Sequence, residues 1–138
     1  KKYPFNVISL SKSFSEQLVK DKVYLVIEAY FDFRLNKSSE VLGASYRIVD
    51  EGGTPAIYDA DGFEIVSGNL DGYYFLQDSD DHITITHKLI FEAGTNTFWE
   101  VYFDNPTDNE RALLDNVVKD LSFREGIPAP MLEHNECS

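Results

Sequence analysis

The chain has 138 residues, of which 43% are hydrophobic and 26% charged, and it carries a formal net charge of −12. This length predicts one domain with its own buried core, and the apolar fraction excludes an intrinsically disordered chain. No apolar run approaches the ~20 residues that a membrane-spanning helix needs. The single cysteine, Cys137, excludes an intramolecular disulfide.

The negative charge is concentrated in the second half of the chain. Residues 1–69 carry eight basic and ten acidic side chains, whereas residues 70–138 carry four basic and fourteen acidic ones. An acidic surface repels phosphate backbones and anionic lipids, which argues against nucleic-acid and direct membrane binding. The negative electrostatic field of this surface would attract basic partners and speed up their encounter. A high net charge can also serve only to keep a protein soluble.

In the first third of the chain, the sequence predicts two strands with a short helix between them. A short apolar run at residues 5–10 indicates a strand, and the capping-box spacing of Ser13 and Glu16 indicates one or two helical turns over residues 13–19. Residues 23–35 form a long β-type run that alternates from residue 27 onward. We expect a dry face with Ile27, Ala29, Phe31, Phe33 and Leu35, and a wet face with Glu28, Tyr30, Asp32 and Arg34.

The middle of the chain predicts further strands separated by polar turns. A turn at residues 36–40 precedes a strand at residues 44–49. Two more short strands, residues 56–58 and 63–66, flank an Asp-rich segment that ends in Gly62. Because glycine accepts the positive φ of a tight turn, we expect these two strands to form a hairpin.

Residues 72–104 predict an antiparallel meander of three strands. Aromatic and β-branched residues favour strands at residues 72–77, 83–92 and 97–104. Residues 78–81 and 94–96 are rich in turn-forming residues and separate the strands.

A helix follows, and it is the clearest pattern in the chain. Thr107 and Glu110 have capping-box spacing, and an apolar stripe continues at intervals of three and four residues through Leu113, Leu114, Val117, Val118 and Leu121. We expect this helix to pack on the dry face of the sheet. The sequence therefore predicts a single α+β domain over residues 1–125, made of an antiparallel, meander-rich sheet with this C-terminal helix on one face and a short N-terminal helix. Residues 126–138 are expected to be an extended or mobile tail.

Motifs for chemistry are incomplete. If Gly62 took the glycine position of an EF-hand loop, Ile57 and Gly68 would occupy ligand positions, so the calcium pattern fails at both ends. The soft metal ligands are His82, His87, His134 and Cys137, and no pair of them has zinc-site spacing. No nucleophile elbow or phosphate loop is present. We therefore expect no cofactor, no metal and no enzymatic activity, and His87 is expected to be a satisfied core or rim histidine.

Recognition is the function that remains. Exposed Tyr and Trp side chains are common at binding hot spots, and adjacent Tyr73 and Tyr74 must point to opposite faces of a strand. Acidic turn residues would steer a basic partner onto the surface. The predicted partner-binding residues are Asp78, Asp80, Asp81, Tyr73, Tyr74, Trp99 and Glu100.

Residues 64–123 resemble the PsbP-like superfamily of small α+β domains. The resemblance rests on the strands SGNLDGYYF, ITITHKLIF and FWEVYF, the turn EAGTNT, and the helix NERALLDNVVKDLSF with its closing Leu121-Ser122-Phe123. Members of that superfamily are mostly accessory subunits, binders and chaperones, so the resemblance implies a binding protein without catalytic residues. The size and acidity are also similar to those of bacterial immunity proteins that neutralise toxins.

Two functional hypotheses follow from these patterns. The first is a bacterial immunity or accessory protein that binds and occludes a basic toxin or effector. The alternative is a periplasmic domain that binds a small ligand or calcium in a pocket between helix and sheet. We expect a periplasmic or other extracytoplasmic location if Lys1 follows a removed signal peptide, and a cytoplasmic one otherwise.

Overall fold

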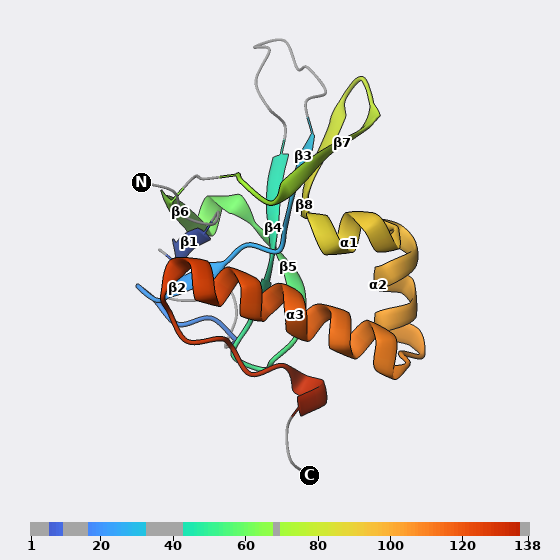
Figure 1. Cartoon of the computed structure of the whole chain (residues 1–138). Helices are drawn as coiled ribbons and strands as arrows, with labels where there is room; N and C mark the ends of the chain where they lie inside the picture. The colour runs from blue at the N-terminus through green and yellow to red at the C-terminus, as the bar shows by residue number, and fades with distance from the viewer. Residues whose placement is uncertain (1–5, 10–16, 33–42, 68–69, 136–138) are drawn as a thin grey trace.

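The computed structural model describes residues 6–9, 17–32, 43–67 and 70–135 (Figure 1). Within these residues, eight strands come first and three α-helices follow them. The elements in chain order are β1 (Asn6–Ser9), β2 (Val23–Leu25), β3 (Glu28–Asp32), β4 (Gly43–Val49), β5 (Pro55–Asp59), η1 (Ala60–Gly62), β6 (Phe63–Ser67), β7 (Tyr73–Ser79), β8 (His82–His87), α1 (Lys88–Ala93), α2 (Thr95–Asp104), α3 (Asp108–Glu125) and η2 (Glu133–Asn135).

The strands form two antiparallel sheets. The larger sheet has the order β5-β4-β3-β8-β7, and the smaller one has the order β2-β1-β6. Chain segments pass from one sheet to the other at Val26 and Ile27, between β2 and β3, and at η1, between β5 and β6. Antiparallel strands with segregated helices, including a C-terminal one, make this an α+β fold, as the sequence predicts.

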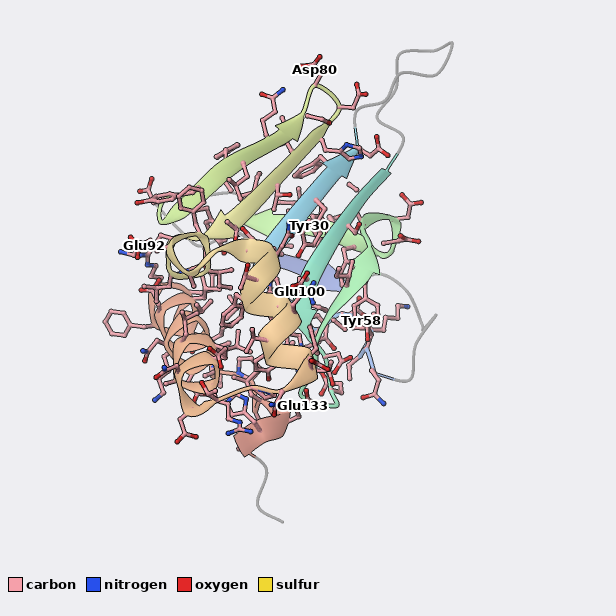
Figure 2. All side chains as sticks on the ribbon, turned by 90° about the vertical axis from the view of Figure 1, so that its right-hand side faces the viewer. Tyr30, Tyr58, Asp80, Glu92, Glu100 and Glu133 are labelled. Carbon is pink, nitrogen blue, oxygen red and sulfur yellow. The ribbon has the colours of Figure 1, made fainter. Side chains whose placement is uncertain are left out.

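The larger sheet is covered on both faces. Helix α2 lies over one face, and the smaller sheet lies behind the other (Figure 2). Phe63 of β6 contacts Tyr46 and Tyr58 of the larger sheet edge-to-face, at centroid distances of 6.0 and 6.5 Å. Helix α3 crosses the end of the larger sheet (Figure 1), and its Val118 and Leu121 line one pocket together with Ile27 and Val49.

Helix α3 confirms the sequence prediction in detail. The Thr107 side chain accepts a hydrogen bond from the backbone N–H of Asn109, Glu110 completes the capping box, and Gly126 ends the helix at φ 75°. The buried residues are Leu114, Val117, Val118, Leu121 and Ser122. After the helix, residues 127–135 lie along the body of the domain, because Leu132 is buried and the Glu133 N–H donates to the Gly53 carbonyl at 2.9 Å.

One predicted strand, residues 83–92, is too long and another, residues 97–104, is wrong, because residues 88–92 and 97–104 form helices. Strand β8 ends at His87, whose ring nitrogen caps α1 by accepting from the Leu89 N–H at 3.1 Å. Residues 97–104 belong to α2, and this helix buries Phe98, Trp99 and Tyr102. Aromatic residues fit half-buried surfaces of either kind, and the spacing of these three also places them on one helical face.

Two further expectations about the strands are wrong. Residues 23–35 do not form one continuous strand, because the run breaks at Val26 and Ile27 and its halves join different sheets. The segment that ends in Gly62 is not a hairpin, because β5 and β6 also join different sheets and η1 connects them.

The predicted turn at residues 36–40 lies outside the described residues, as do residues 13–16 of the short helix; residues 17–19 are not helical. Within the described ranges, no helix combines the length and the hydropathy needed to cross a membrane.

Candidate functional site

A row of side chains with a polar centre crosses the larger sheet on the face beneath α2. Glu28 pairs with Arg47 on one side and with Thr86 on the other, and the row ends in Ile57 and Tyr74. Since side chains alternate along a strand, the next row on this face comes two residues further along. That second row consists of Asp59, Ser45, Tyr30, Thr84 and Leu76.

Glu28 is the centre of this face and has no solvent-exposed surface. Its Oε2 accepts a hydrogen bond from Thr86 Oγ1 at 2.6 Å, and its Oε1 accepts from Trp99 Nε1 at 3.0 Å and from the Tyr30 hydroxyl. Burial raises the pKa of Glu28, while these hydrogen bonds and the charge of Arg47 act in the opposite direction. The prediction that Glu28 lies on a wet face is therefore wrong, because α2 covers it.

Arg47 is the positive partner in this network and is 8% exposed. Its Nε lies 3.9 Å from Glu28 Oε1 and donates to the Tyr30 hydroxyl oxygen at 3.1 Å, and its Nη1 donates to the Pro55 carbonyl at 2.7 Å. The guanidinium carbon lies 4.1 Å from the centre of the Trp99 ring, within cation–π distance. Burial also raises the pKa of Tyr30. Glu28 and Arg47 thus each have several partners. A buried ion pair needs such partners, because they offset the cost of removing both charges from water.

A cleft of about 980 Å³ opens between this face and α2. The helix side is formed by residues 94–97 together with Glu100 and Phe103, and the sheet side includes Tyr30, Arg47 and Thr84. This volume lies near the upper end of the range for small-molecule sites, ~300–1,000 Å³. Glu28 belongs to the floor of the cleft but has no accessible surface, so a molecule in the cleft would meet its neighbours instead. A general acid must come within hydrogen-bond reach of its substrate, and Glu28 has no surface open to the cleft in this arrangement.

The acidic residues predicted to bind a partner lie at the tip of the β7–β8 hairpin. Asp80 and Asp81 are exposed there, and Figure 2 shows Asp80 at the outer end of the hairpin. Asp78 lies in β7, and its side chain is outside the described residues. The tip therefore presents carboxylates away from the helical side of the domain.

Of the aromatic residues predicted to bind a partner, Tyr73 and Trp99 are buried and Tyr74 is exposed. Tyr73 and Tyr74 point to opposite faces, as predicted: Tyr73 is buried and donates to the Val26 carbonyl at 2.6 Å, whereas Tyr74 is 41% exposed. Trp99 lies on α2, is 7% exposed and contacts Glu28. Glu100, the next residue, is exposed at the mouth of the cleft (Figure 2). The seven predicted residues thus occupy three separate places: the hairpin tip, β7 and α2.

Sequence reasoning missed Glu28, Arg47 and Tyr30 as a connected group. Their separation along the chain hides the contact, because Arg47 belongs to another strand and the covering Trp99 belongs to a helix predicted as a strand. One signal was available in the sequence: Glu28 interrupts a mainly apolar run, with the five residues VYLVI before it and AYF after it. A lone carboxylate in such a run must be paired if the run is buried.

Three histidine–carboxylate pairs of the described residues lie away from the cleft, and in one of them His82 Nε2 is 3.7 Å from Asp32 Oδ2. His87 Nε2 is 2.8 Å from Asp120 Oδ2, and because its Nδ1 accepts from the Leu89 N–H, we assign the ring proton to Nε2. Burial lowers the pKa of His87. His134 lies between Asp115, at 3.1 Å, and the Tyr102 hydroxyl, at 3.0 Å. Within the residues that the structure describes, no group of three or more His, Cys, Asp or Glu side chains is arranged to hold a metal ion.

Comparisons with known proteins returned no match to the chain: no family model, no curated protein and no solved structure resembles it significantly. The resemblance to the PsbP-like superfamily stays a prediction.

Proposed function

We propose that the protein is a non-catalytic binding module, an immunity or accessory protein of bacterial origin that occludes a basic toxin or effector. One observation carries the proposal: the exposed carboxylates of Asp80 and Asp81 project from the end of the sheet, in the half of the chain that holds fourteen acidic and four basic residues. Such a projecting acidic element attracts a basic cleft and increases the rate of encounter.

The buried network supports binding over catalysis. Glu28 is the carboxylate whose pKa is raised within the cleft, and Thr86, Tyr30 and Trp99 already donate to its two oxygens. A catalytic carboxylate must exchange a proton with a substrate, which Glu28 cannot reach without displacement of these neighbours. The network instead fixes α2 against the sheet and gives a partner a rigid surface.

The proposal is tested by affinity capture from the lysate of the source organism, followed by binding kinetics with the captured protein. We expect one stoichiometric basic partner that high salt releases. Reversing the tip charges, D80K with D81K, should lower the association rate at low salt by about tenfold and weaken its salt dependence. The matched control, D61K with E64K, makes the same charge change at exposed positions of η1 and β6 and should have a smaller effect.

Two outcomes contradict the proposal. Capture of no stoichiometric partner would remove the support for a protein-binding module. A partner whose association rate responds equally to the tip variant and to the control variant would leave protein binding in place and remove the hairpin tip from it.

Small-ligand binding in the cleft is the second candidate, and the cleft volume of about 980 Å³ favours it. A ligand that binds only the folded state raises the melting temperature. We expect any such rise, in a screen of calcium chloride and small organic molecules, to be lost in T97W, which places a large ring at the mouth of the cleft. A rise that T97W leaves unchanged would place the ligand elsewhere.

A further inference from the structure

Strand β7 forms an open edge of the larger sheet. It pairs with β8 alone among the described strands. Folded proteins protect such edges with proline, charged side chains, bulges or very short strands, because an open edge is a template for another strand. The opposite edge strand, β5, begins with Pro55. In β7, by contrast, the bulge comes only after Gln77, and residues 73–77 contain neither proline nor a charged side chain.

The register of β7 shows which backbone groups face this open edge. The Lys88 N–H donates to the Gly72 carbonyl at 3.0 Å, so the Tyr73–His87 pair is a non-hydrogen-bonded one. Hydrogen-bonded and non-hydrogen-bonded pairs alternate along an antiparallel ladder. The N–H and C=O groups of Phe75 and Gln77 therefore point away from β8, where no described residue bonds to them. These four groups suffice to begin a ladder with one more strand.

Apolar side chains accompany these backbone groups on both faces of the edge. Phe75 is 59% exposed and Tyr74 is 41% exposed. Phe75 continues the apolar row of the sheet through Ile85 and Ala29, so a strand placed beyond it would extend a packed surface. Side chains directly opposite each other on neighbouring strands contribute to sheet stability.

The charged residues near β7 indicate which kind of added strand this edge would favour. Asp80 and Asp81 lie beyond one end of β7, and exposed Asp71 lies just before the other end. Glu92 is exposed on α1, next to Phe91, whose ring contacts Tyr74 at 4.8 Å. A second copy of the chain would bring the same acidic groups to this edge, and like charges at short range are unfavourable.

These four acidic residues outnumber the two basic ones near the start of β7, Lys88 and Arg124. Arg124 Nε donates to Asp120 Oδ1 at 3.2 Å, and Arg124 Nη1 donates to the Asp71 carbonyl at 2.8 Å. The Arg124 guanidinium is thus already hydrogen-bonded to groups of the same domain.

We propose that β7 binds an extended, basic segment of a partner protein as a sixth strand of the larger sheet. The inference rests on the proposed function, since it states how a basic partner is held after the acidic tip has attracted it. In such β-augmentation, main-chain hydrogen bonds give the affinity and alternate side chains give the specificity.

The test uses a short synthetic peptide of alternating lysine and valine, and amide chemical shifts of the full chain. Two control peptides accompany it: one with glutamate in place of lysine, and one with the lysine–valine sequence and every backbone nitrogen methylated. We expect the unmodified basic peptide to shift the amide signals of Phe75 and Gln77 and to slow their hydrogen exchange. Neither control peptide should do so, because one has the wrong charge and the other cannot donate hydrogen bonds.

A matched pair of variants locates the site. F75K removes the exposed ring and adds a like charge to a basic strand, and we expect it to weaken binding of the peptide by about fivefold or more. I57K makes the same charge change on the other edge strand, where Ile57 is 49% exposed, and should alter binding by less than about twofold. Both variants should retain the melting temperature of the wild type within a few degrees, since surface changes cost little.

Other results overturn the inference. Equal shifts with the methylated peptide would show charge attraction without strand pairing, and unshifted Phe75 and Gln77 amides with all peptides would show an edge that takes no strand. Concentration-dependent protection of these amides without peptide would assign the edge to a second copy. Each of these results leaves the lysate capture as the separate test of the proposed function.

Discussion

The two faces of the larger sheet are built from the same strands but have opposite chemistry. Beneath α2, Glu28 lies between Arg47 and Thr86, and polar groups of three strands meet. The adjacent row on the other face consists of Tyr58, Tyr46, Ala29, Ile85 and Phe75. One face is stabilised by directional contacts, and the other by the removal of apolar surface from water.

This contrast shows that burial and polarity are separate properties of a sheet face. Glu28 and Ala29 are neighbours in the sequence, and both are 0% exposed. The apolar side chain tolerates any well-packed neighbour, whereas the carboxylate depends on particular donors being in place. The polar face should therefore be the more sensitive of the two to a single truncation.

The largest expected effect comes from truncation of Glu28 on the polar face. E28A leaves the Arg47 charge buried without its carboxylate and removes the acceptor of Thr86 and Trp99. We expect the free energy of unfolding to fall by about 3–5 kcal/mol, measured by urea denaturation. E28Q keeps the shape and an acceptor oxygen and should lose less. Equal losses in E28A and E28Q would mean that the negative charge decides the effect, and that the side-chain volume and the retained acceptor oxygen do not.

The matching truncation on the apolar face is I48A. Ile48 is 0% exposed and has no polar atom in its side chain. Its loss should lower the free energy of unfolding by about 2–5 kcal/mol through lost burial and a residual cavity. The same change at exposed Ile57, I57A, serves as the control and should cost far less. If I48A proved more damaging than E28A, the polar face would not be the more sensitive one.

The sequence predicts the apolar face better than the polar face. The alternation from residue 27 correctly predicts that Ala29 is buried, and the spacing of Thr107 and Glu110 correctly predicts the start of α3. Both signals depend only on residues that are close together in the sequence. The same alternation assigns Glu28 to solvent, because it cannot show that α2 covers that face. The residues of α2 favour a strand by composition, and only tertiary packing decides between the two.

A smaller effect should appear in the pH dependence of the polar face. Burial raises the pKa of Glu28 above 4.5, so the folded state holds this proton more tightly than the unfolded state. Its contribution to stability is fully present below about pH 4.5 and is lost as pH rises through the folded-state pKa. The stability of the wild type relative to E28Q should therefore fall as pH rises from 4.5, in denaturation series on both chains. A constant difference across that range would contradict a raised pKa, since the other carboxylates titrate in both chains.

On the apolar side of the sheet, the pH dependence should have the opposite sign. His87 follows Ile85 on the same face of β8, and burial lowers its pKa below 6.5, against the opposing influence of Asp120. The charges of Arg124 and Lys88 lower it further. The neutral ring thus contributes stability that is present above about pH 6.5 and lost as pH falls through the folded-state pKa.

H87N isolates this contribution, because asparagine can still cap α1 by accepting from the Leu89 N–H but does not titrate. The free energy of unfolding of the wild type relative to H87N should decrease as pH is lowered from 6.5, in denaturation measurements paired at each pH. The effect should be smaller than either truncation, because only the protonation of a retained side chain changes. A difference that grew on acidification would mean that the His87–Asp120 pair gains more from charge than burial costs it, and the two faces would then not differ in the sign of their response.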